Sequence, residues 1–433
     1  MALLGCKNIQ KRCGIRVKVY IWILAMKPLV RRTLLSLLYR CCCRKNLAPQ
    51  DSLLNSTRVV VIRFDEIGDL ILTLPFLREL RRFMPNARIA LVVRPALVNL
   101  LELCPYIDVV IPFVPKYGFR PGRLRSLLAL RRAVADALGG VPDIGILPRF
   151  DADFSRGLMA LLATGAMRRV AFSQSATPEK AIADAGTDHF LTHPIHPDPT
   201  PMHELKRNLF LLEAMGATIE NDRLELHMPP EDRNKAEQLL SQFSDIQMWI
   251  GLCAGASIPR KRWPIDRYAQ VAKCITANYS NCGVVVIGGP ADRNAGVDIQ
   301  RNIPGRVLNV AGELTLRETA AVLEKCVLYI GNDTGPMHLA AAVGVPVVAV
   351  FADPHPVSIA EHGDDRHARF DPWGVPYRIV TPSAGATTGD SARTSAANPI
   401  GSVTVDQVID AVTQLLPRAR RSSEIAQKLS ATR

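Results

Sequence analysis

The strongest constraint on the fold is a repeated alternation of short apolar runs with longer segments of helical periodicity. In the first half of the chain the apolar runs cover residues 58–64, 87–93, 108–113, 143–148 and 168–172. Their apolar residues are consecutive rather than at every second position, so each run predicts a strand covered on both faces. Strand–helix repeats of this length are typical of a parallel, doubly wound α/β sheet. A helix is predicted at residues 70–83.

The alternation pauses between residues 173 and 198 and resumes after a predicted helix at residues 202–217. The Pro-rich stretch at 227–232 marks a boundary. Five further apolar runs follow, at residues 248–252, 284–289, 306–310, 327–331 and 345–351. At 433 residues the chain exceeds the size at which one core stops growing. The sequence therefore predicts two doubly wound, Rossmann-like domains that face a cleft.

Charge divides the chain further. The net charge is +13, but residues 1–50 hold eleven Lys and Arg and no acid, and the tail at 418–433 is basic as well. The part between is close to neutral, which argues against nucleic acid as a partner and favours an anionic surface near the termini. We expect a basic extension at 1–50, domains at 51–230 and 231–417, and a basic tail. A Ser-, Ala-, Thr- and Gly-rich stretch at 383–400 predicts a mobile loop.

The basic extension has two interpretations. An apolar run at 19–26, followed by leucines at helical spacing among arginines, predicts an amphipathic anchor on an anionic membrane surface. The run is much shorter than the roughly 20 residues of a spanning helix. The alternative is a disordered extension, with Met26 as a plausible start. The ten cysteines include no C-x-x-C pair, as expected of reduced thiols in a cytoplasmic protein.

Ligands of open parallel sheets bind beyond the carboxyl ends of the strands, and the first such loop with unusual residues is DEIGD at 65–69. Gly68 permits close approach of the backbone. Asp69 falls at the start of a helix, where a carboxylate is favoured. Asp69 is therefore either an acid–base residue or an ordinary helix cap.

Two loops of the second domain carry features of a phosphate and ribose site. In CAGASIPRKRWP, at 253–264, Gly255, Ala256 and Ser257 are small enough for backbone N–H groups to meet a phosphate, and Lys261 stands among three adjacent cations. A solvated basic loop is the alternative. In GGPADRN, at 288–294, Asp292 either takes ribose hydroxyls or caps a helix.

The fourth loop is NDTGPMH at 332–338, where a buried strand meets a buried helix. The pattern places Asp333 and Thr334 at the N-cap and Gly335 and Pro336 in the first turn. Helix N-termini bind anions, and beyond Met337 the side chain of His338 shares a face with Thr334. The junction is predicted to hold a phosphate, the alternative being a well-capped core helix. The histidines at 188–203 have loose spacing, so neither a metal nor a cofactor is expected.

With these loops in place, the chain resembles glycosyltransferase family 9, the bacterial heptosyltransferases of lipopolysaccharide core assembly. The resemblance is carried by RFDEIGDLILTLPFLRELRRFMP, HELKRNLFLLEAMG, GASIPRKRWPIDRYAQVA, VVIGGPADR and the stretch around GNDTGPMHLAAAVGVPVVAVF. It implies a GT-B fold with an N-terminal acceptor domain and a C-terminal donor domain. It also implies inverting transfer of a heptose, or a similar sugar, from an ADP-sugar to a lipid-linked core glycan at the cytoplasmic face of the inner membrane.

The resemblance implies residue roles as well. The catalytic acid of the family falls on Asp69, and its donor-phosphate lysine falls on Lys261. Its D-T-G-x-x-H element and the acid after its Gly turn fall on Asp333, Thr334, Gly335, His338 and Asp292. Four features depart from the family pattern and bear on the substrate more than on the reaction: the basic extension, Ile67 where methionine is frequent, the long segment after Phe351 and the 383–400 insertion.

Two other functions stay open. The first is a non-catalytic protein that binds a nucleotide sugar, against which the presence of both Asp69 and Lys261 argues, because a binder needs no base opposite the phosphate. The second is a GT-B nucleotide-sugar epimerase, which would release a free epimerised nucleotide sugar without transfer to an acceptor.

Overall fold

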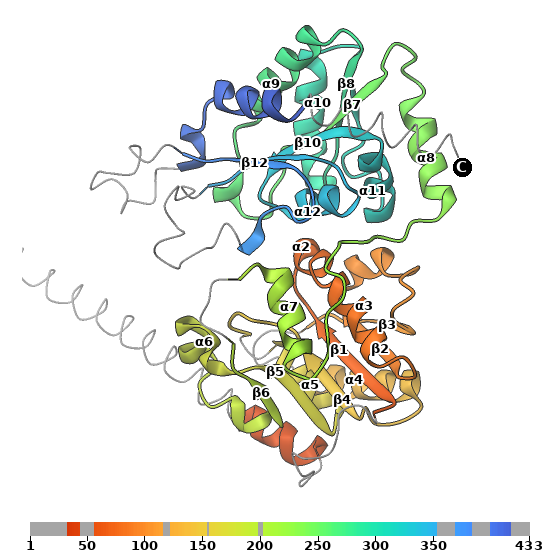
Figure 1. Cartoon of the computed structure of the whole chain (residues 1–433), viewed down its shortest axis with the longest axis vertical. Helices are drawn as coiled ribbons and strands as arrows, with labels where there is room; N and C mark the ends of the chain where they lie inside the picture. The colour runs from red at the N-terminus through yellow and green to blue at the C-terminus, as the bar shows by residue number, and fades with distance from the viewer. Residues whose placement is uncertain are drawn as a thin grey trace, which may run out of the picture.

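The structure, a computed structural model, describes residues 33–43, 56–115, 122–153, 156–197, 202–352, 369–382 and 399–416. Within them the chain forms two α/β lobes stacked end to end (Figure 1). The predicted anchor and basic tail lie outside the described residues apart from residues 33–43, and so does the predicted mobile loop apart from residues 399–400.

The first lobe is built on a sheet of six parallel strands in the order β3-β2-β1-β4-β5-β6. Its strands are β1 (Arg58–Arg63), β2 (Arg88–Val93), β3 (Val109–Pro112), β4 (Ile144–Leu147), β5 (Arg168–Phe172) and β6 (His193–Ile195). Alternate residues of β1 pack into two different apolar clusters, Val59 and Val61 into one and Val60 and Ile62 into the other. This double coverage explains why the apolar residues of the strands are consecutive instead of alternating with polar ones.

The helices of the first lobe lie on both faces of this sheet. They are α2 (Ile67–Ile71), α3 (Leu74–Phe83), α4 (Arg123–Leu138), α5 (Arg156–Thr164), α6 (Pro178–Ala183) and α7 (Glu204–Glu213), with a 3₁₀ segment, η2, at Pro95–Leu100. The single helix predicted at 70–83 is wrong, because the structure has two helices there. Pro75 lies in the first turn of α3, where its missing N–H is tolerated. Because a proline disrupts a helix that runs through it, α2 cannot continue into α3.

The second lobe repeats the arrangement, with the strand order β12-β11-β10-β7-β8-β9. Counted along its own strands, each lobe has the Rossmann order. The strands are β7 (Met248–Cys253), β8 (Cys282–Val286), β9 (Val307–Asn309), β10 (Cys326–Asn332), β11 (Val347–Val350) and β12 (Tyr377–Val380). The helices are α8 (Pro230–Leu240), α9 (Ile265–Asn278), α10 (Arg293–Asn302), α11 (Leu316–Glu324), α12 (Gly335–Ala342) and a last one at 405–416. The predicted pair of doubly wound domains is confirmed.

The edge strands β6 and β12 were not predicted from the sequence. Both are short and none of the three residues of β6 is fully buried, so neither produces a continuous apolar run. Among the described residues no helix is long and apolar enough to cross a membrane.

Part of the basic extension belongs to the first lobe. Residues 33–42 form a helix whose Leu35 and Leu38 are buried in the apolar cluster beneath α4 and α5. The ring of Tyr39 packs edge-on against Phe190, with centroids 5.7 Å apart. This helix therefore completes the core of the lobe, and removing it would expose apolar surface.

Candidate active site

The two lobes meet where α2 contacts α12 (Figure 1). At Gly68 an added Cβ would lie 2.5 Å from Cδ2 of His338, and at Gly335 an added Cβ would lie 2.6 Å from Cβ of Ile67. Only glycine fits at either position without movement. The contact brings together the DEIGD loop of the first lobe and the TGPMH helix start of the second.

Asp69 lies in the first turn of α2, and its carboxylate accepts the backbone N–H of Glu66 at 3.2 Å. Its other oxygen lies 3.4 Å from Nη2 of Arg63, and the side chain is 28% exposed. Burial raises the pKa of Asp69, and the nearby Glu204 raises it further, against the lowering effect of Arg63. A carboxylate with a raised pKa is a stronger base at neutral pH than an ordinary aspartate. Asp69 therefore caps its helix and has the properties of a general base as well.

Asp65, the other acid near this turn, is differently placed. One of its oxygens lies 3.1 Å from Nε of Arg63 and the other is paired with Arg149. Because both oxygens are held by cations, we interpret Asp65 as a structural anion that orients the two arginines.

On the second lobe, Lys261 forms an ion pair with the carboxylate of Asp333, immediately before the start of α12. The two side chains are 27% and 19% exposed, so the ammonium group is accessible while held in place. The neighbouring Arg262 is placed differently, because its guanidinium donates to the backbone carbonyl of Ala256 at 2.7 Å.

The role of Asn332 was not predicted from the sequence. Its side chain holds the loop of Lys261 to β10. Its side-chain oxygen accepts the backbone N–H of Trp263 at 3.1 Å and the hydroxyl of Tyr268 at 2.9 Å. Its amide donates to the carbonyls of Ala254 and Gly255 at 2.9 and 3.2 Å. An asparagine that is fully buried at the end of an apolar strand is the sequence signal that could have identified this role.

Asp292 lies between the two small-residue loops. Its carboxylate accepts the N–H of Gly289 at 2.9 Å, and a Cβ added at Gly255 would lie 2.3 Å from its Cγ. Ala256 is nearly buried and Ser257 is exposed. The structure thus brings the GASI and GGPAD loops into direct contact, as a shared ligand site requires.

At the start of α12, Thr334 has the extended backbone of an N-cap, but its hydroxyl donates to the carbonyl of Asn332 at 3.4 Å instead of capping the helix. Pro336 lies in the first turn as predicted, and Met337 is fully buried. The first N–H groups of α12 therefore have no side-chain cap from Thr334, which suits the binding of an anion.

His338 is 4% exposed, and burial lowers its pKa to about 4. The imidazole is therefore neutral at physiological pH and contributes no positive charge. Its Nδ1 has no hydrogen-bond partner among the described residues. We interpret His338 as a neutral hydrogen-bonding group at the lobe contact.

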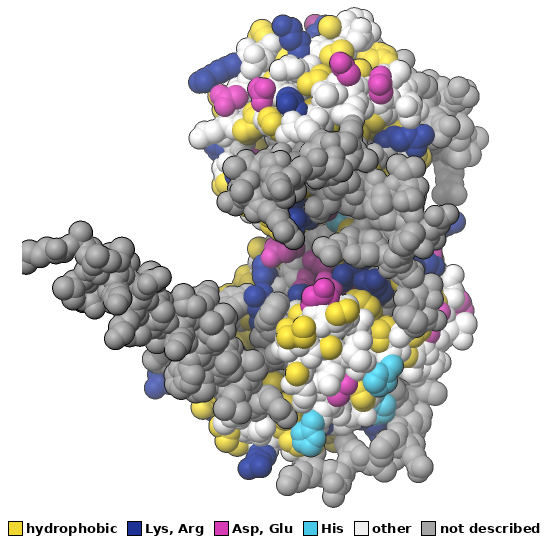
Figure 2. Space-filling view, turned by 90° about the vertical axis from the view of Figure 1, so that its left-hand side faces the viewer, with side chains coloured by type: hydrophobic (Ala, Val, Ile, Leu, Met, Phe, Trp, Pro, Cys, Tyr) yellow, Lys and Arg dark blue, Asp and Glu magenta, His cyan; other side chains and the backbone are white. Residues whose placement is uncertain are grey.

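A set of buried charged residues beside α2 was not predicted from the sequence either. Glu204, the first residue of α7, is 2% exposed and lies 3.4 Å from Nη2 of Arg63. Arg369 reaches it from the segment that precedes β12, with Nη2 2.6 Å from Oε2 of Glu204. Acidic and basic side chains accordingly gather at the junction of the lobes in Figure 2.

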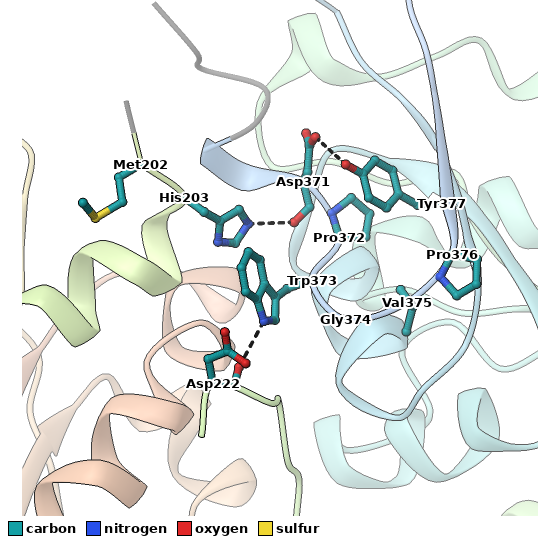
Figure 3. Close-up of a pocket in the computed structure, with 10 residues that line it drawn as sticks. All are labelled: Met202, His203, Asp222, Asp371, Pro372, Trp373, Gly374, Val375, Pro376 and Tyr377. Carbon is teal, nitrogen blue, oxygen red and sulfur yellow. Dashed lines mark hydrogen bonds between the residues drawn. The ribbon is translucent and has the colours of Figure 1, made fainter. Parts of the chain in front are cut away.

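A pocket of about 740 Å³ opens between α7 and the segment before β12 (Figure 3). His203 caps α7 by accepting the N–H of Leu205 at 3.2 Å, and its Nε2 donates to the carbonyl of Asp371 at 3.0 Å. The indole N–H of Trp373 donates to the carbonyl of Asp222 at 3.0 Å. No residue predicted to bind substrate lines this pocket, so we place the chemistry at the contact of α2 and α12 instead.

Two Rossmann-like lobes that meet in this way are the architecture of the GT-B class. The chain belongs to glycosyltransferase family 9: residues 162–385 match the family profile described as "Glycosyltransferase family 9 (heptosyltransferase)". The predicted fold and family are confirmed, and the chain is a glycosyltransferase.

Individual relatives agree with this assignment. The lipopolysaccharide core heptosyltransferase OpsX of Haemophilus influenzae is 25% identical over 309 residues, which are 70% of this chain and 81% of the relative. The crystal structure of a family 9 glycosyltransferase from Veillonella parvula has a TM-score of 0.68 and 25% identity, covering 85% of this chain and all of that one. The E. coli ADP-heptose lps heptosyltransferase II has a TM-score of 0.61 at 20% identity, covering 84% of this chain and all of that one.

Proposed function

We propose that this enzyme transfers a heptose, or a similar sugar, from an ADP-sugar to a lipopolysaccharide core or a related lipid-linked glycan, with inversion at the anomeric carbon. The observation that carries the proposal is the contact between α2, which holds Asp69, and α12, beside whose start Lys261 is paired with Asp333. The relatives include a lipopolysaccharide core heptosyltransferase and an ADP-heptose heptosyltransferase, which supports heptose and ADP as the first choices for sugar and nucleotide.

In the proposed mechanism the acceptor hydroxyl attacks the anomeric carbon of the donor while its proton passes to the carboxylate of Asp69. The bond between the anomeric carbon and the diphosphate oxygen breaks on the opposite face of the sugar. Lys261 and the N–H groups at the start of α12 stabilise the negative charge that develops on the departing diphosphate. Attack and departure on opposite faces produce the inversion.

A panel of nucleotide sugars, followed by thermal shift of the full chain, tests the donor assignment. A ligand present at 100 times its Kd stabilises the folded protein by about 2.7 kcal/mol. ADP-heptose is expected to raise the melting temperature most, ahead of UDP- and GDP-sugars. Stabilisation by a UDP-sugar with none by ADP-heptose would contradict the donor assignment.

The family match is to transferases, so we favour neither the binding protein nor the epimerase.

Lys261→Ala is expected to weaken binding of the nucleotide diphosphate. A charge-assisted hydrogen bond is worth about 1.5–3 kcal/mol, so the Kd of ADP measured by calorimetry should rise roughly tenfold or more. Arg260→Ala removes the same charge one residue earlier and serves as the matched control. Equal, small losses in both variants would show that Lys261 makes no specific contact with the donor.

We infer that the basic extension binds anionic membrane on the cytoplasmic side. Residues 1–32 hold eight of the eleven cations of the extension, and a cation near an anionic surface contributes about 1 kcal/mol. A truncation that begins at Thr33 keeps the helix at 33–42 and should stay folded while losing flotation with anionic vesicles. If the full-length chain fails to float with anionic vesicles at low salt, or floats equally with neutral ones, the electrostatic anchor is wrong.

A further inference from the structure

We propose that Arg369 and Glu204 are positioning residues that act through Arg63 to hold Asp69 in its proton-accepting form when the second lobe docks on the first. The inference rests on the proposed function, in which Asp69 is the base. It assigns a role to three residues that lie outside the donor loops, and it links the junction of the lobes to the chemistry.

Arg63 is the centre of this arrangement. Its guanidinium is 1% exposed, and Nη2 lies 3.4 Å from both Oδ1 of Asp69 and Oε1 of Glu204. The same guanidinium donates to the carbonyl of Pro148. One buried cation is therefore shared by the candidate base, Glu204 and Asp65, whose Oδ2 lies 3.1 Å from Nε of Arg63.

Arg369 brings a second cation to Glu204 from the other lobe. Its Nε and Nη2 donate to Oε2 of Glu204 at 2.8 and 2.6 Å, and its two Nη atoms donate to the two oxygens of Asp151 at 2.8 and 2.9 Å. It stands on the segment that runs into β12, whereas Glu204 and Asp151 belong to the first lobe. This pairing therefore joins the two lobes.

The arrangement of these charges determines how readily Asp69 gives up its proton. With Arg369 in place, Glu204 is neutralised from the second lobe and Arg63 remains available to Asp69. Without Arg369, Glu204 would compete for Arg63 and repel the carboxylate of Asp69. Burial raises the pKa of Asp69 and Glu204 adds to this, while Arg63 and Arg369 oppose it. Burial would also raise the pKa of Glu204, but Arg369 and Arg63 outweigh this effect and its pKa is lowered.

The other charged groups near α2 do not replace this arrangement. Across the lobe contact, His338 of α12 is neutral at physiological pH because its pKa is about 4. In the DEIGD loop, the carboxylate of Asp65 is held by Arg63 and Arg149, and that of Glu66 is paired with Arg94. The other titratable groups around Glu204 and Arg369 are Arg207, Asp151 and His203, and burial lowers the pKa of His203.

The test is the pH profile of kcat/KM for transfer, whose acidic limb reports the ionisation of the base in the free enzyme. Arg369→Gln should move the acidic limb upward by roughly one pH unit, the smaller end of the shift that a neighbouring charge causes. Glu204→Gln should move it downward, and the double variant should return it towards wild type. Arg369→Lys keeps the charge and should leave the limb close to its wild-type position.

Asp151→Asn is the matched control. It removes one ion pair between the lobes but leaves the pair of Arg369 with Glu204, so the acidic limb should stay in place whatever happens to KM. Limbs that coincide in wild type, Arg369→Gln and Glu204→Gln would overturn the inference and leave a purely structural contact. A wild-type chain without transfer activity would instead refute the proposed function, so the two failures are distinguishable.

Discussion

Replacing Asp69 with Asn is expected to reduce the rate of transfer by about 10²–10⁴, the usual contribution of general-base catalysis. Asparagine keeps the shape of the side chain, and its oxygen can still accept the N–H of Glu66. The melting temperature should change little, because the loss of stability is about 1 kcal/mol or less. Affinity for the nucleotide should hold, since the predicted donor loops lie on the other lobe. Turnover, melting temperature and ADP affinity measured on the same sample give the comparison.

Glu66→Gln is the control for this variant. It alters the capping residue of the same turn, at a side chain that is 69% exposed and paired with Arg94, without touching the carboxylate of Asp69. Turnover should stay within a few-fold of wild type. Near-normal turnover in Asp69→Asn would end the catalytic assignment, and Asp65 would be a poor substitute because both of its oxygens are held by arginines.

Arg63→Met is expected to have the largest effect on stability. The guanidinium is 1% exposed and contacts three carboxylates, those of Asp65, Asp69 and Glu204. Removing one partner of a buried ion pair costs about 3–5 kcal/mol, because the charges left behind are neither solvated nor paired. For a domain of this size the melting temperature should fall by about 6–20 °C.

Arg233→Met is the matched surface substitution. Arg233 is 42% exposed and pairs with Glu324 at 2.8 Å, so its loss should reduce the free energy of unfolding by less than about 1 kcal/mol. Unfolding in urea compares the two variants directly. If Arg63→Met is no more destabilising than Arg233→Met, the buried charges contribute little to the fold, and their importance would lie in catalysis alone.

The sequence could predict the interior of both sheets because a strand covered on both faces is mostly apolar and lacks a polar residue at every second position. RRVAF at 168–172 coincides with β5, and the run at 58–64 coincides with β1 to within one residue. The edge strands β6 and β12 lack this signal because they are partly exposed. The break between α2 and α3 depends on Pro75, whose place in a first turn is not evident from the helical periodicity around it.

The residues of the candidate site also fall into two groups, those that the sequence could indicate and those that it could not. Asp69, Lys261, Asp333 and His338 follow shortly after strand ends, where the topology of a parallel sheet places ligands, so the sequence could indicate them. Glu204 and Arg369 are different, since they meet across 165 residues of sequence. Their roles arise from the way the lobes dock, and no local pattern in the sequence records that docking.

The central claim, that this chain transfers a sugar with Asp69 as the base, is tested most directly by one assay. The purified full-length chain is incubated with ADP-heptose and a lipid-linked core acceptor that lacks heptose, and both products are followed by mass spectrometry. We predict that the acceptor gains heptose while ADP is released in equal amount, and that Asp69→Asn forms both products at least about a hundredfold more slowly. Consumption of the nucleotide sugar by hydrolysis or epimerisation, with the mass of the acceptor unchanged, would contradict the account.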